Sequence, residues 1–246
     1  MFKMNRIIFA IIGFVVSLNI HGQTSGGEIS RKSTPSVRSS QNKKNNDGDL
    51  YAKTGVHNGY DFVDLGLSVR WATCNVGANS PELYGNYYAW GEIYSKSNYT
   101  KLNSETYGIK MSDISGNPQY DAARYKNGGT WRIPTKEEFN ELINNCKWTK
   151  TKFKNVIGYK VTGPSGMSIF LPFGGCMLDD SIDESTKYNE GCYWTSTPYT
   201  RDSPNSAPDD NDLSWYVYIM ENGPTMFYGN YMYRRGLGLN IRPICN

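Results

Sequence analysis

The pattern of hydrophobic and polar positions near the middle of the chain predicts a buried strand that passes directly into an amphipathic helix. The strand contains Trp131, and Pro134 keeps the residue before it extended. Thr135 and Glu138 have the spacing of a capping box, in which each side chain bonds to the main-chain amide of the other residue. Apolar residues then recur at helical spacing, at Phe139, Leu142, Ile143 and Cys146. We therefore predict a helix over residues 135–146.

Shorter apolar segments predict strands elsewhere in the chain. They span residues 61–67, 69–72, 87–90, 159–162, 168–172, 193–196, 215–220 and 239–242. A second, short helix is expected over residues 121–125. The 19 tyrosines, 6 tryptophans and 25 glycines favour short strands, tight turns and aromatic packing over long helices. Together these patterns predict an α+β domain with much loop.

The first 54 residues predict export followed by a linker. Residues 1–22 have a basic start, an apolar run from Ile7 to Val16 and small residues before the expected cleavage point, as a signal peptide has. The run is too short for the roughly 20 residues that span a bilayer. Residues 23–54 are rich in Ser, Gly, Asn, Lys and Gln and are expected to be disordered. The domain is then 55–246, and we expect the mature chain to be extracellular or on the cell surface, without a transmembrane anchor, with the periplasm as the alternative.

Charge and histidine content argue against several functions. The signal carries a net charge of +2 and the linker +3, against +3 for the whole chain, so the folded region carries −2 and no nucleic-acid partner is expected. His21 leaves with the signal, and His57 alone remains, which excludes histidine triads and multi-histidine metal sites. A Cys–His pair that uses His57 stays open. No glycine-rich phosphate loop is present. We therefore expect no cofactor other than the calcium considered below, and no catalysis.

Several motifs resemble those of one bacterial family. They are Asn58 to Ala78, Tyr88 to Glu92, Trp131 to Phe139, Asn145 to Thr149, Phe170 to Pro172, Tyr193 to Ser196 and Ile241 to Pro243. Together they span the folded region and resemble the Fibrobacter succinogenes major paralogous domain family, which is found widely in Bacteroidota. The resemblance implies a C-type-lectin-like fold with short, twisted antiparallel strands. It implies architecture and export more than any activity, because the family has no general assigned activity.

The same fold is shared with formylglycine-generating enzymes, or sulfatase-modifying factors. By resemblance, their oxidase activity requires two closely spaced, copper-binding cysteines near the carboxyl end. Here Cys192 and Cys245 are far apart in sequence, so the pattern is missing. An oxidase of this type is therefore an unfavoured alternative.

The five cysteines of this exported chain suggest disulfides. Their odd number leaves one unpaired, and the sequence does not fix the connectivity. We favour Cys176 with Cys192, because they border one excursion between strands expected to be neighbours, and then Cys74 with Cys146. Buried free thiols are the alternative, since cysteine packs as a small apolar side chain.

An acidic run suggests calcium. Asp209, Asp210 and Asp212, with Asn211 between them, offer the oxygen ligands that calcium prefers. The EF-hand spacing and the lectin motifs built on Glu-Pro-Asn and Trp-Asn-Asp are absent. A solvated acidic loop is therefore favoured over a calcium site.

The last quarter of the chain is the predicted ligand-binding region, because it combines aromatic residues and arginine with small polar residues, as recognition surfaces do. The candidates are Tyr199, Arg201, Trp215, Tyr228, Asn230, Tyr231, Tyr233 and Arg234. We expect the segment from Tyr228 to Arg235 to be an exposed loop. Replacing Tyr231 and Arg234 with alanine is then expected to abolish binding at nearly constant melting temperature.

These patterns favour an exported, non-catalytic module that binds a protein or glycan at the bacterial cell surface. The layout also resembles target proteins of diversity-generating retroelements, which place variable positions near the end of this fold, so the ligand-binding region is expected to be a place of diversification. A structural component of the surface or of an appendage is the alternative.

Overall fold

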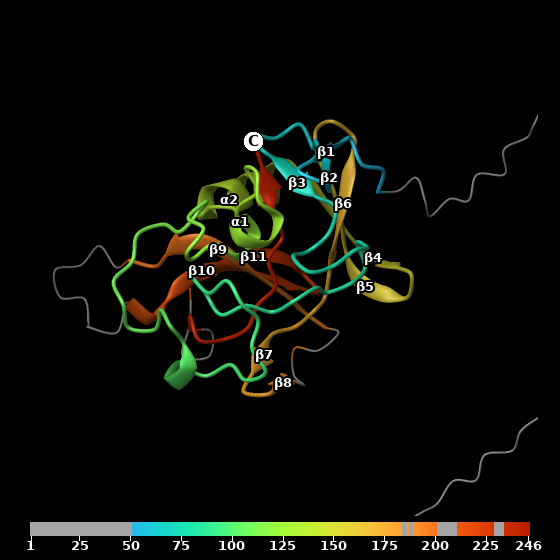
Figure 1. Cartoon of the computed structure of the whole chain (residues 1–246). Coiled ribbons are helices and arrows are strands. Elements are labelled where there is room, and N and C mark those ends of the chain that lie inside the picture. The colour runs from blue at the N-terminus through green and yellow to red at the C-terminus, as the bar shows by residue number, and fades with distance from the viewer. Residues whose placement is uncertain (1–50, 184–185, 187–188, 201–210, 229–233) are drawn as a thin grey trace, which may run out of the picture. The chain divides into compact units, whose positions relative to one another are not determined.

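The structure is a computed structural model that describes residues 51–183, 186, 189–200, 211–228 and 234–246. Short antiparallel strands dominate these residues, accompanied by two α-helices, short 3-10 segments and much loop (Figure 1). The predicted α+β class is therefore confirmed. None of the described helices is both long and apolar enough to cross a membrane.

The first sheet joins the start of the domain to its carboxyl end. Its strands, in spatial order, are β1 (Gly55–His57), β2 (Tyr60–Val63), β3 (Arg70–Ala72) and β12 (Ile244–Cys245). The β1–β2 turn is Asn58–Gly59, and both residues have positive φ, as a tight type I′ hairpin requires. Trp71 of β3 pairs with Val63 on one side and Ile244 on the other, so the carboxyl end closes the sheet.

The second sheet is a meander of consecutive strands. It comprises β4 (Lys147–Phe153), β5 (Val156–Thr162) and β6 (Ser168–Pro172). The β4–β5 turn places Lys154 and Asn155 at positive φ. All five residues of β6 are buried, whereas the three lysines of β4 are exposed and only Phe153 of that strand is buried. The meander therefore has one edge in solvent and one in the core.

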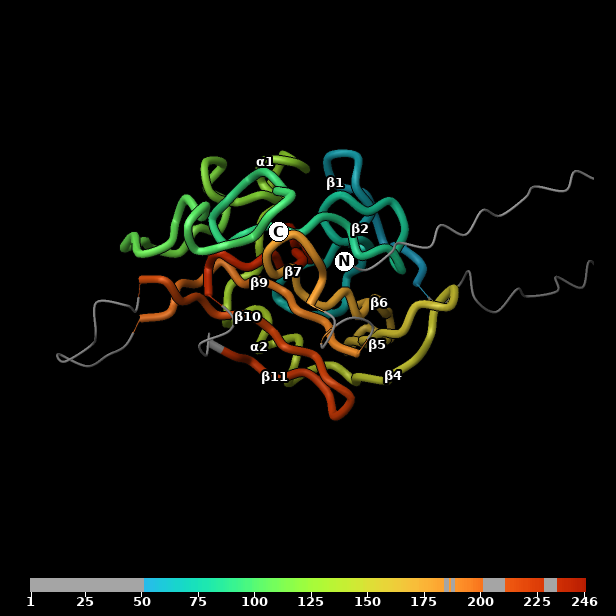
Figure 2. The backbone as a smooth tube through the Cα atoms, turned by 90° about the horizontal axis from the view of Figure 1, so that it is seen from below, coloured from blue at the N-terminus to red at the C-terminus, as the bar shows by residue number. Residues whose placement is uncertain are grey.

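The third sheet has β10 at its centre. It comprises β9 (Gly191–Pro198), β10 (Ser214–Met220) and β11 (Gly223–Tyr228), which run side by side in Figure 2. A separate hairpin is formed by β7 (Met177–Leu178) and β8 (Ser181–Ile182). The register pairs Trp215 with Tyr228 and Ser214 with Pro198. The amino end of β10 therefore lies beside the carboxyl ends of both its neighbours.

The predicted long helix is present as α2 (Lys136–Asn145), and its capping box is confirmed. Thr135 is the N-cap and accepts from the Glu138 amide, while the Glu138 carboxylate accepts from the Thr135 amide at 2.8 Å. Arg132 adds a two-pronged ion pair to the same carboxylate, at 2.6 and 2.8 Å. The helix packs against all three strands of the third sheet.

The second predicted helix is α1 (Ala122–Asn127), with Asp121 as its N-cap. The buried Asp121 carboxylate accepts from the amides of Arg124, Gly116 and Ile133. Burial raises the pKa of Asp121 to about 6, against the effect of these hydrogen bonds. The residue thereby ties α1 to the segment before α2. The predicted strand around Trp131 is not formed there: the segment has only an isolated bridge between Arg132 and Ile244. A 3-10 turn, η1 (Lys101–Asn103), lies before α1, and residues 211–212 also have 3-10 conformation.

The core consists of aromatic clusters around α2 and the third sheet. Trp71 meets Phe139 edge to face, with ring centroids 5.0 Å apart. The indole of Trp194 donates to the carbonyl of Tyr88 at 2.8 Å, and that of Trp90 donates to Thr195 at 2.9 Å. These bonds fix loop segments to β9 without regular strands, which explains how a loop-rich chain keeps a buried core.

The strand predictions were right in the core and less so at its borders. The strand over 168–172 has the predicted bounds, and those over 159–162, 193–196 and 215–220 lie inside β5, β9 and β10. The predicted strand over 61–67 ends at Val63. Segments 87–90 and 239–242 are not strands, but meet through an isolated bridge between Tyr88 and Leu239.

Candidate functional site

One end of the third sheet brings together predicted binding residues. The amino end of β10 carries Trp215, and the carboxyl end of β9 leads to Tyr199. Segments 201–210 and 229–233, which join this region along the chain, lie outside the described residues. We call this region the sheet end and define it by its described members, Tyr107, Lys136, Tyr199, Asp212, Trp215 and Arg234.

An aromatic pair with a cation forms the first part of the sheet end. Tyr199 meets the Trp215 ring edge to face, with centroids 5.6 Å apart. Lys136, the first residue of α2, places its ammonium 4.6 Å from the centroid of the Trp215 ring. Its main-chain amide donates to the Thr197 hydroxyl at 3.1 Å, which fixes the start of α2 beside β9. The half-buried Trp215 is thus held between two partners on rigid elements.

An arginine held from two sides forms the second part. Arg234 donates to the Tyr107 hydroxyl at 2.6 Å and forms an ion pair with Asp212. Partial burial lowers the pKa of Arg234, but the Tyr107 hydroxyl and the Asp212 charge outweigh it and raise the pKa above its ordinary value. The Arg234 side chain keeps 30% of its exposure, whereas Asp212 is only 2% exposed. A guanidinium is therefore presented at the surface in a fixed position.

The same ion pair bears on the calcium prediction. The Asp212 carboxylate faces Arg234, so a cation bound there would have to displace the guanidinium. Asp209 and Asp210 lie outside the described residues. Within the described ranges, no group of three or more His, Cys, Asp or Glu residues is placed to hold a metal ion.

Arg235 is buried, which corrects the prediction that the segment from Tyr228 to Arg235 is exposed throughout. It is only 1% exposed and turns inward, with its guanidinium 4.2 Å from the Trp90 ring centroid. It donates to the carbonyls of Ile109 at 2.7 Å and Leu213 at 3.1 Å. Burial lowers the pKa of Arg235 to about 10. Arg235 therefore anchors the loops behind the sheet end, while its neighbour Arg234 faces outward.

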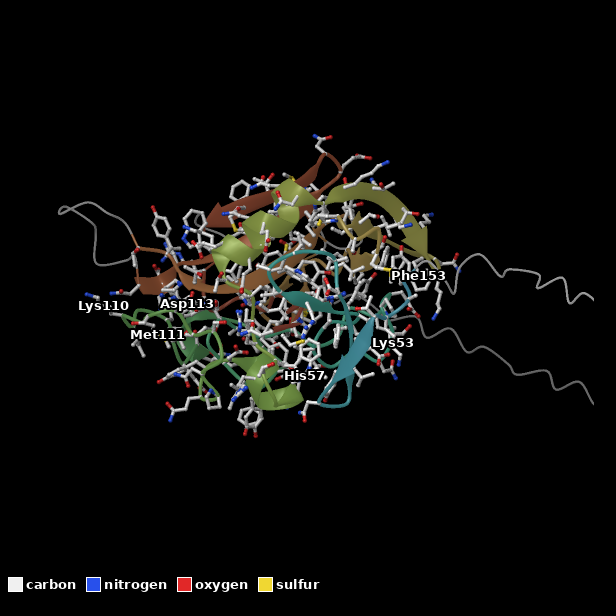
Figure 3. All side chains as sticks on the ribbon, turned by 90° about the horizontal axis from the view of Figure 1, so that it is seen from above. Lys53, His57, Lys110, Met111, Asp113 and Phe153 are labelled. Carbon is white, nitrogen blue, oxygen red and sulfur yellow. The ribbon has the colours of Figure 1, made fainter. Side chains whose placement is uncertain are left out.

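The loop anchored by Arg235 continues along the rim of the sheet end. Figure 3 shows Lys110, Met111 and Asp113 together on this loop, at the side of the molecule where β9 ends. Asp113 accepts from the Thr197 hydroxyl at 2.7 Å. The loop is therefore attached to the same residues that position Lys136 and Trp215.

From the predicted ligand-binding set, the structure brings Tyr199 and Trp215 into contact, whereas Arg234 contacts Tyr107 and Asp212. Arg201, Asn230, Tyr231 and Tyr233 lie outside the described residues, and Tyr228 is known only by its main-chain pairing with Trp215. Sequence reasoning missed Tyr107 and Lys136, because both come from distant segments. No local motif at either residue indicates the contact.

His57, which the sequence left open as half of a Cys–His pair, makes contacts that attach the β1–β2 hairpin to the segment before α2. Its Nε2 accepts from the Thr130 amide at 2.9 Å, and its ring lies 5.7 Å from the centroid of Trp131. Figure 3 places His57 beside α1, away from Lys110, Met111 and Asp113. Within the described part of the chain, no hydrogen bond links its ring to a cysteine. His57 thus holds the β1–β2 hairpin to the segment around Thr130 and Trp131 before α2.

All five cysteines are free thiols in this structure. Cys74 lies beside β3, and Cys146 is the C-cap of α2, where burial raises its pKa to about 11. Cys176 and Cys192 are both buried in one core cluster, with their thiols within hydrogen-bonding reach. Gly175 and Gly191, which precede them, also pair as an isolated bridge.

We expect Cys176 and Cys192 to form a disulfide when the protein is exported through an oxidising compartment, because their thiols are already neighbours. Intact mass under non-reducing conditions should fall by the mass of two hydrogen atoms. The crosslink closes a loop of about 15 residues, so reduction should lower the free energy of unfolding by about 3 kcal/mol. Cys176→Ala should abolish both effects, whereas Cys245→Ala should leave the mass difference intact. A fully reduced protein after oxidative refolding would contradict the pairing.

No family model matches the chain, and neither a curated protein nor a solved structure is significantly similar to it. Its function is therefore inferred from the residues and geometry described above.

Proposed function

We propose that this protein is an exported, non-catalytic binding module of the C-type-lectin-like fold, of the Fibrobacter succinogenes major paralogous type. In this proposal it recognises a protein or glycan at the bacterial cell surface through the sheet end. The observation that carries the proposal is the half-buried Trp215, held between Tyr199 and Lys136, while Asp212, three residues before Trp215, holds the surface guanidinium of Arg234.

This arrangement supports recognition for physical reasons. Aromatic rings and arginine dominate binding energy at interfaces because they bury large areas and make directed bonds. Their side chains lose little freedom on binding when the free protein already holds them, and here strands and α2 do so. The buried charge of Asp212 fixes Arg234. The sheet end is therefore preorganised.

The fold named in the proposal is supported by the structural role of the motifs that resemble the family. Trp131 and Trp194 are fully buried, and the segment after Trp131 forms the capped helix on which the third sheet packs. These motifs thus build the core. Tyr199, Trp215 and Arg234, the members of the ligand-binding set whose side chains the structure describes, are only half-buried, which suits a scaffold that presents binding residues at its surface.

Arg234 is a poor choice for the first binding test, although the sequence suggested it. Its removal would leave the buried Asp212 carboxylate without its partner, and an unpaired buried charge costs about 1–3 kcal/mol or more. The expectation of an unchanged melting temperature for that variant is therefore revised. Lys136 and Trp215 are better targets.

The purified protein should bind specific ligands on glycan and cell-surface-protein arrays, and the double variant Lys136→Ala, Trp215→Ala should bind them at least tenfold more weakly. Tenfold corresponds to about 1.4 kcal/mol, a modest loss for two contact residues. The matched control is Tyr125→Ala, Lys126→Ala on α1, another exposed aromatic–lysine pair, with the ammonium 5.4 Å from the ring. It should bind like the parent protein.

Each other result has a definite meaning. Equal loss in both double variants would remove the assignment to the sheet end. An absence of ligands together with self-association of the protein would favour a structural component instead. Binding that requires calcium would place a metal beside Asp212, and the Arg234 ion pair would then have to rearrange.

A further inference from the structure

A cavity of about 290 Å³ lies where the β2–β3 region meets the end of α1. Its wall comes from three separate parts of the chain, namely residues 59–61, most of residues 72–79, and Asn127. Small-molecule pockets typically measure about 300–1,000 Å³. This cavity therefore suits a ligand the size of a single ring. It shares no residue with the sheet end, so binding in this cavity is independent of the function proposed there.

Asn127 contributes to the wall a side-chain amide that is available for hydrogen bonding. The residue is only 6% exposed, and its main-chain carbonyl accepts from the Asn58 amide. Its own side-chain amide makes no hydrogen bond to any described residue. The amide lines the cavity, where water can reach it, so its hydrogen-bonding groups are available to a ligand. A ligand that both accepts and donates hydrogen bonds would satisfy this amide.

The wall, as far as the structure describes it, carries no unpaired charge. Asp61 is its acidic residue, and its carboxylate pairs with Lys53 at 2.9 Å. The other side chains are amides, hydroxyls, a thiol and small apolar groups. An ionic ligand would lose hydration in this cavity without gaining a free opposite charge. The chemistry of the wall therefore favours an uncharged, polar ligand.

An exposed aromatic ring completes the cavity. Tyr60 is 42% exposed, and its ring stands edge to face against Trp131, with centroids 6.4 Å apart. Its hydroxyl donates to the Lys126 carbonyl, so the ring is fixed at both ends. A fixed ring offers an apolar surface beside the amides of Asn127 and Asn79. The wall thus combines an apolar face with hydrogen-bonding groups.

We propose that this cavity binds one neutral sugar ring, either a free monosaccharide or the terminal residue of a glycan. A sugar ring has hydroxyl groups that both donate and accept, and it has an apolar face of C–H groups. The amide of Asn127, with that of Asn79 at the rim, bonds to the hydroxyls. The ring of Tyr60 packs against the C–H face.

Substitution of Asn127 by leucine separates a binding role from a structural one. Asn127→Leu removes the amide and keeps most of the volume, so it should abolish sugar binding, with affinity at least tenfold lower. The melting temperature should stay level, because the amide makes no hydrogen bond to any described residue and its loss breaks no contact within the fold. Asn144→Leu, at an exposed position of α2, is the control and should bind sugar like the parent protein.

The test uses the purified protein with a panel of neutral hexoses, 6-deoxyhexoses and N-acetylhexosamines, and with glucuronic acid and glucosamine as charged probes. Saturation-transfer NMR reports binding. Protection of Cys74, a half-exposed thiol in the wall, from a maleimide reports its location, in a Cys146→Ser background that removes the other half-exposed thiol. We expect a neutral sugar both to bind and to slow the labelling of Cys74.

Testing the sugar in two forms, free and at the end of a glycan, distinguishes the two possible ligands. Binding of free monosaccharides indicates a soluble sugar, whereas binding only to immobilised glycans with that terminal residue indicates a glycan end, and either result supports the proposal. Three results overturn it: no protection of Cys74 by any neutral sugar or glycan, binding of the charged sugars alone, or undiminished binding in Asn127→Leu. A lower melting temperature in that variant with binding retained would show that Asn127 is structural.

Discussion

Replacement of Arg242 by methionine should lower the free energy of unfolding by about 5 kcal/mol or more. The guanidinium is fully buried and donates to four acceptors, the side-chain oxygen of Asn75 and the carbonyls of Ala72, Thr73 and Phe170, at 2.8 to 3.0 Å. Methionine fills much of the volume but satisfies none of these acceptors, and each one left buried costs about 1–3 kcal/mol. Since a whole domain is stable by about 5–15 kcal/mol, this one change threatens the fold.

Urea unfolding followed by circular dichroism would measure this loss. Arg70→Met is the matched control, because Arg70 is exposed and bonds only to the Asn246 carbonyl and the Phe62 ring among the described residues. It should cost about 1 kcal/mol or less. Arg242→Lys should fall between the two, since an ammonium replaces a fork of five donors with three. If Arg242→Met unfolded at the same urea concentration as the parent protein, the central role of this arginine would be wrong.

The position of Arg242 also shows what the sequence could and could not predict. An arginine between Ile241 and Pro243 reads locally as the end of an apolar strand, and a strand over 239–242 was predicted there. In the structure this segment is fixed by side-chain donors from Arg242 and by isolated bridges at Leu239 and Asn240. Long-range hydrogen bonds to irregular backbone leave no periodic trace in the sequence.

Local chemistry, by contrast, was enough for α2. Pro134, Thr135 and Glu138 determine the start of the helix by bonds between near neighbours, so a motif of a few residues predicts it. The fully buried β6 was predicted for a similar reason, since a continuous apolar run bounded by turn residues has few alternatives. The missed strand β4 has the sequence KWTKTKF, and its exposed residues stand at both odd and even positions of an edge strand, so no alternation of apolar and polar residues marks it.

The candidate binding region was predictable in composition but not in detail. Aromatic residues and arginines near the carboxyl end indicated where recognition would occur, and Tyr199, Trp215 and Arg234 do lie at one end of a sheet. Adjacent arginines have opposite roles, because Arg235 turns inward onto Trp90 while Arg234 faces outward. Their sequence context is too similar to separate them. Only the positions of Asp212 and Trp90 in space decide which arginine is available.

Replacement of Trp131 by alanine should cost about 3 to 5 kcal/mol, the usual range for removing a buried tryptophan ring. Trp131 is fully buried in a cluster with Ala72 and Cys245, where the strands from the two ends of the domain meet. Its indole donates to the His57 carbonyl at 2.9 Å and so holds the β1–β2 hairpin. The loss therefore has two parts, a cavity and an orphaned carbonyl.

Trp131→Phe separates the two parts, because it keeps most of the ring and removes the donor. It should cost about 1–3 kcal/mol, the range for one unsatisfied buried group, and therefore less than the alanine variant. Tyr125→Ala, an exposed aromatic on α1, controls for the loss of a ring as such and should cost far less. Thermal and urea unfolding would rank the three variants. Equal stability of Trp131→Ala and the parent protein would mean that the hairpin and β12 hold together without this ring, against the packing described here.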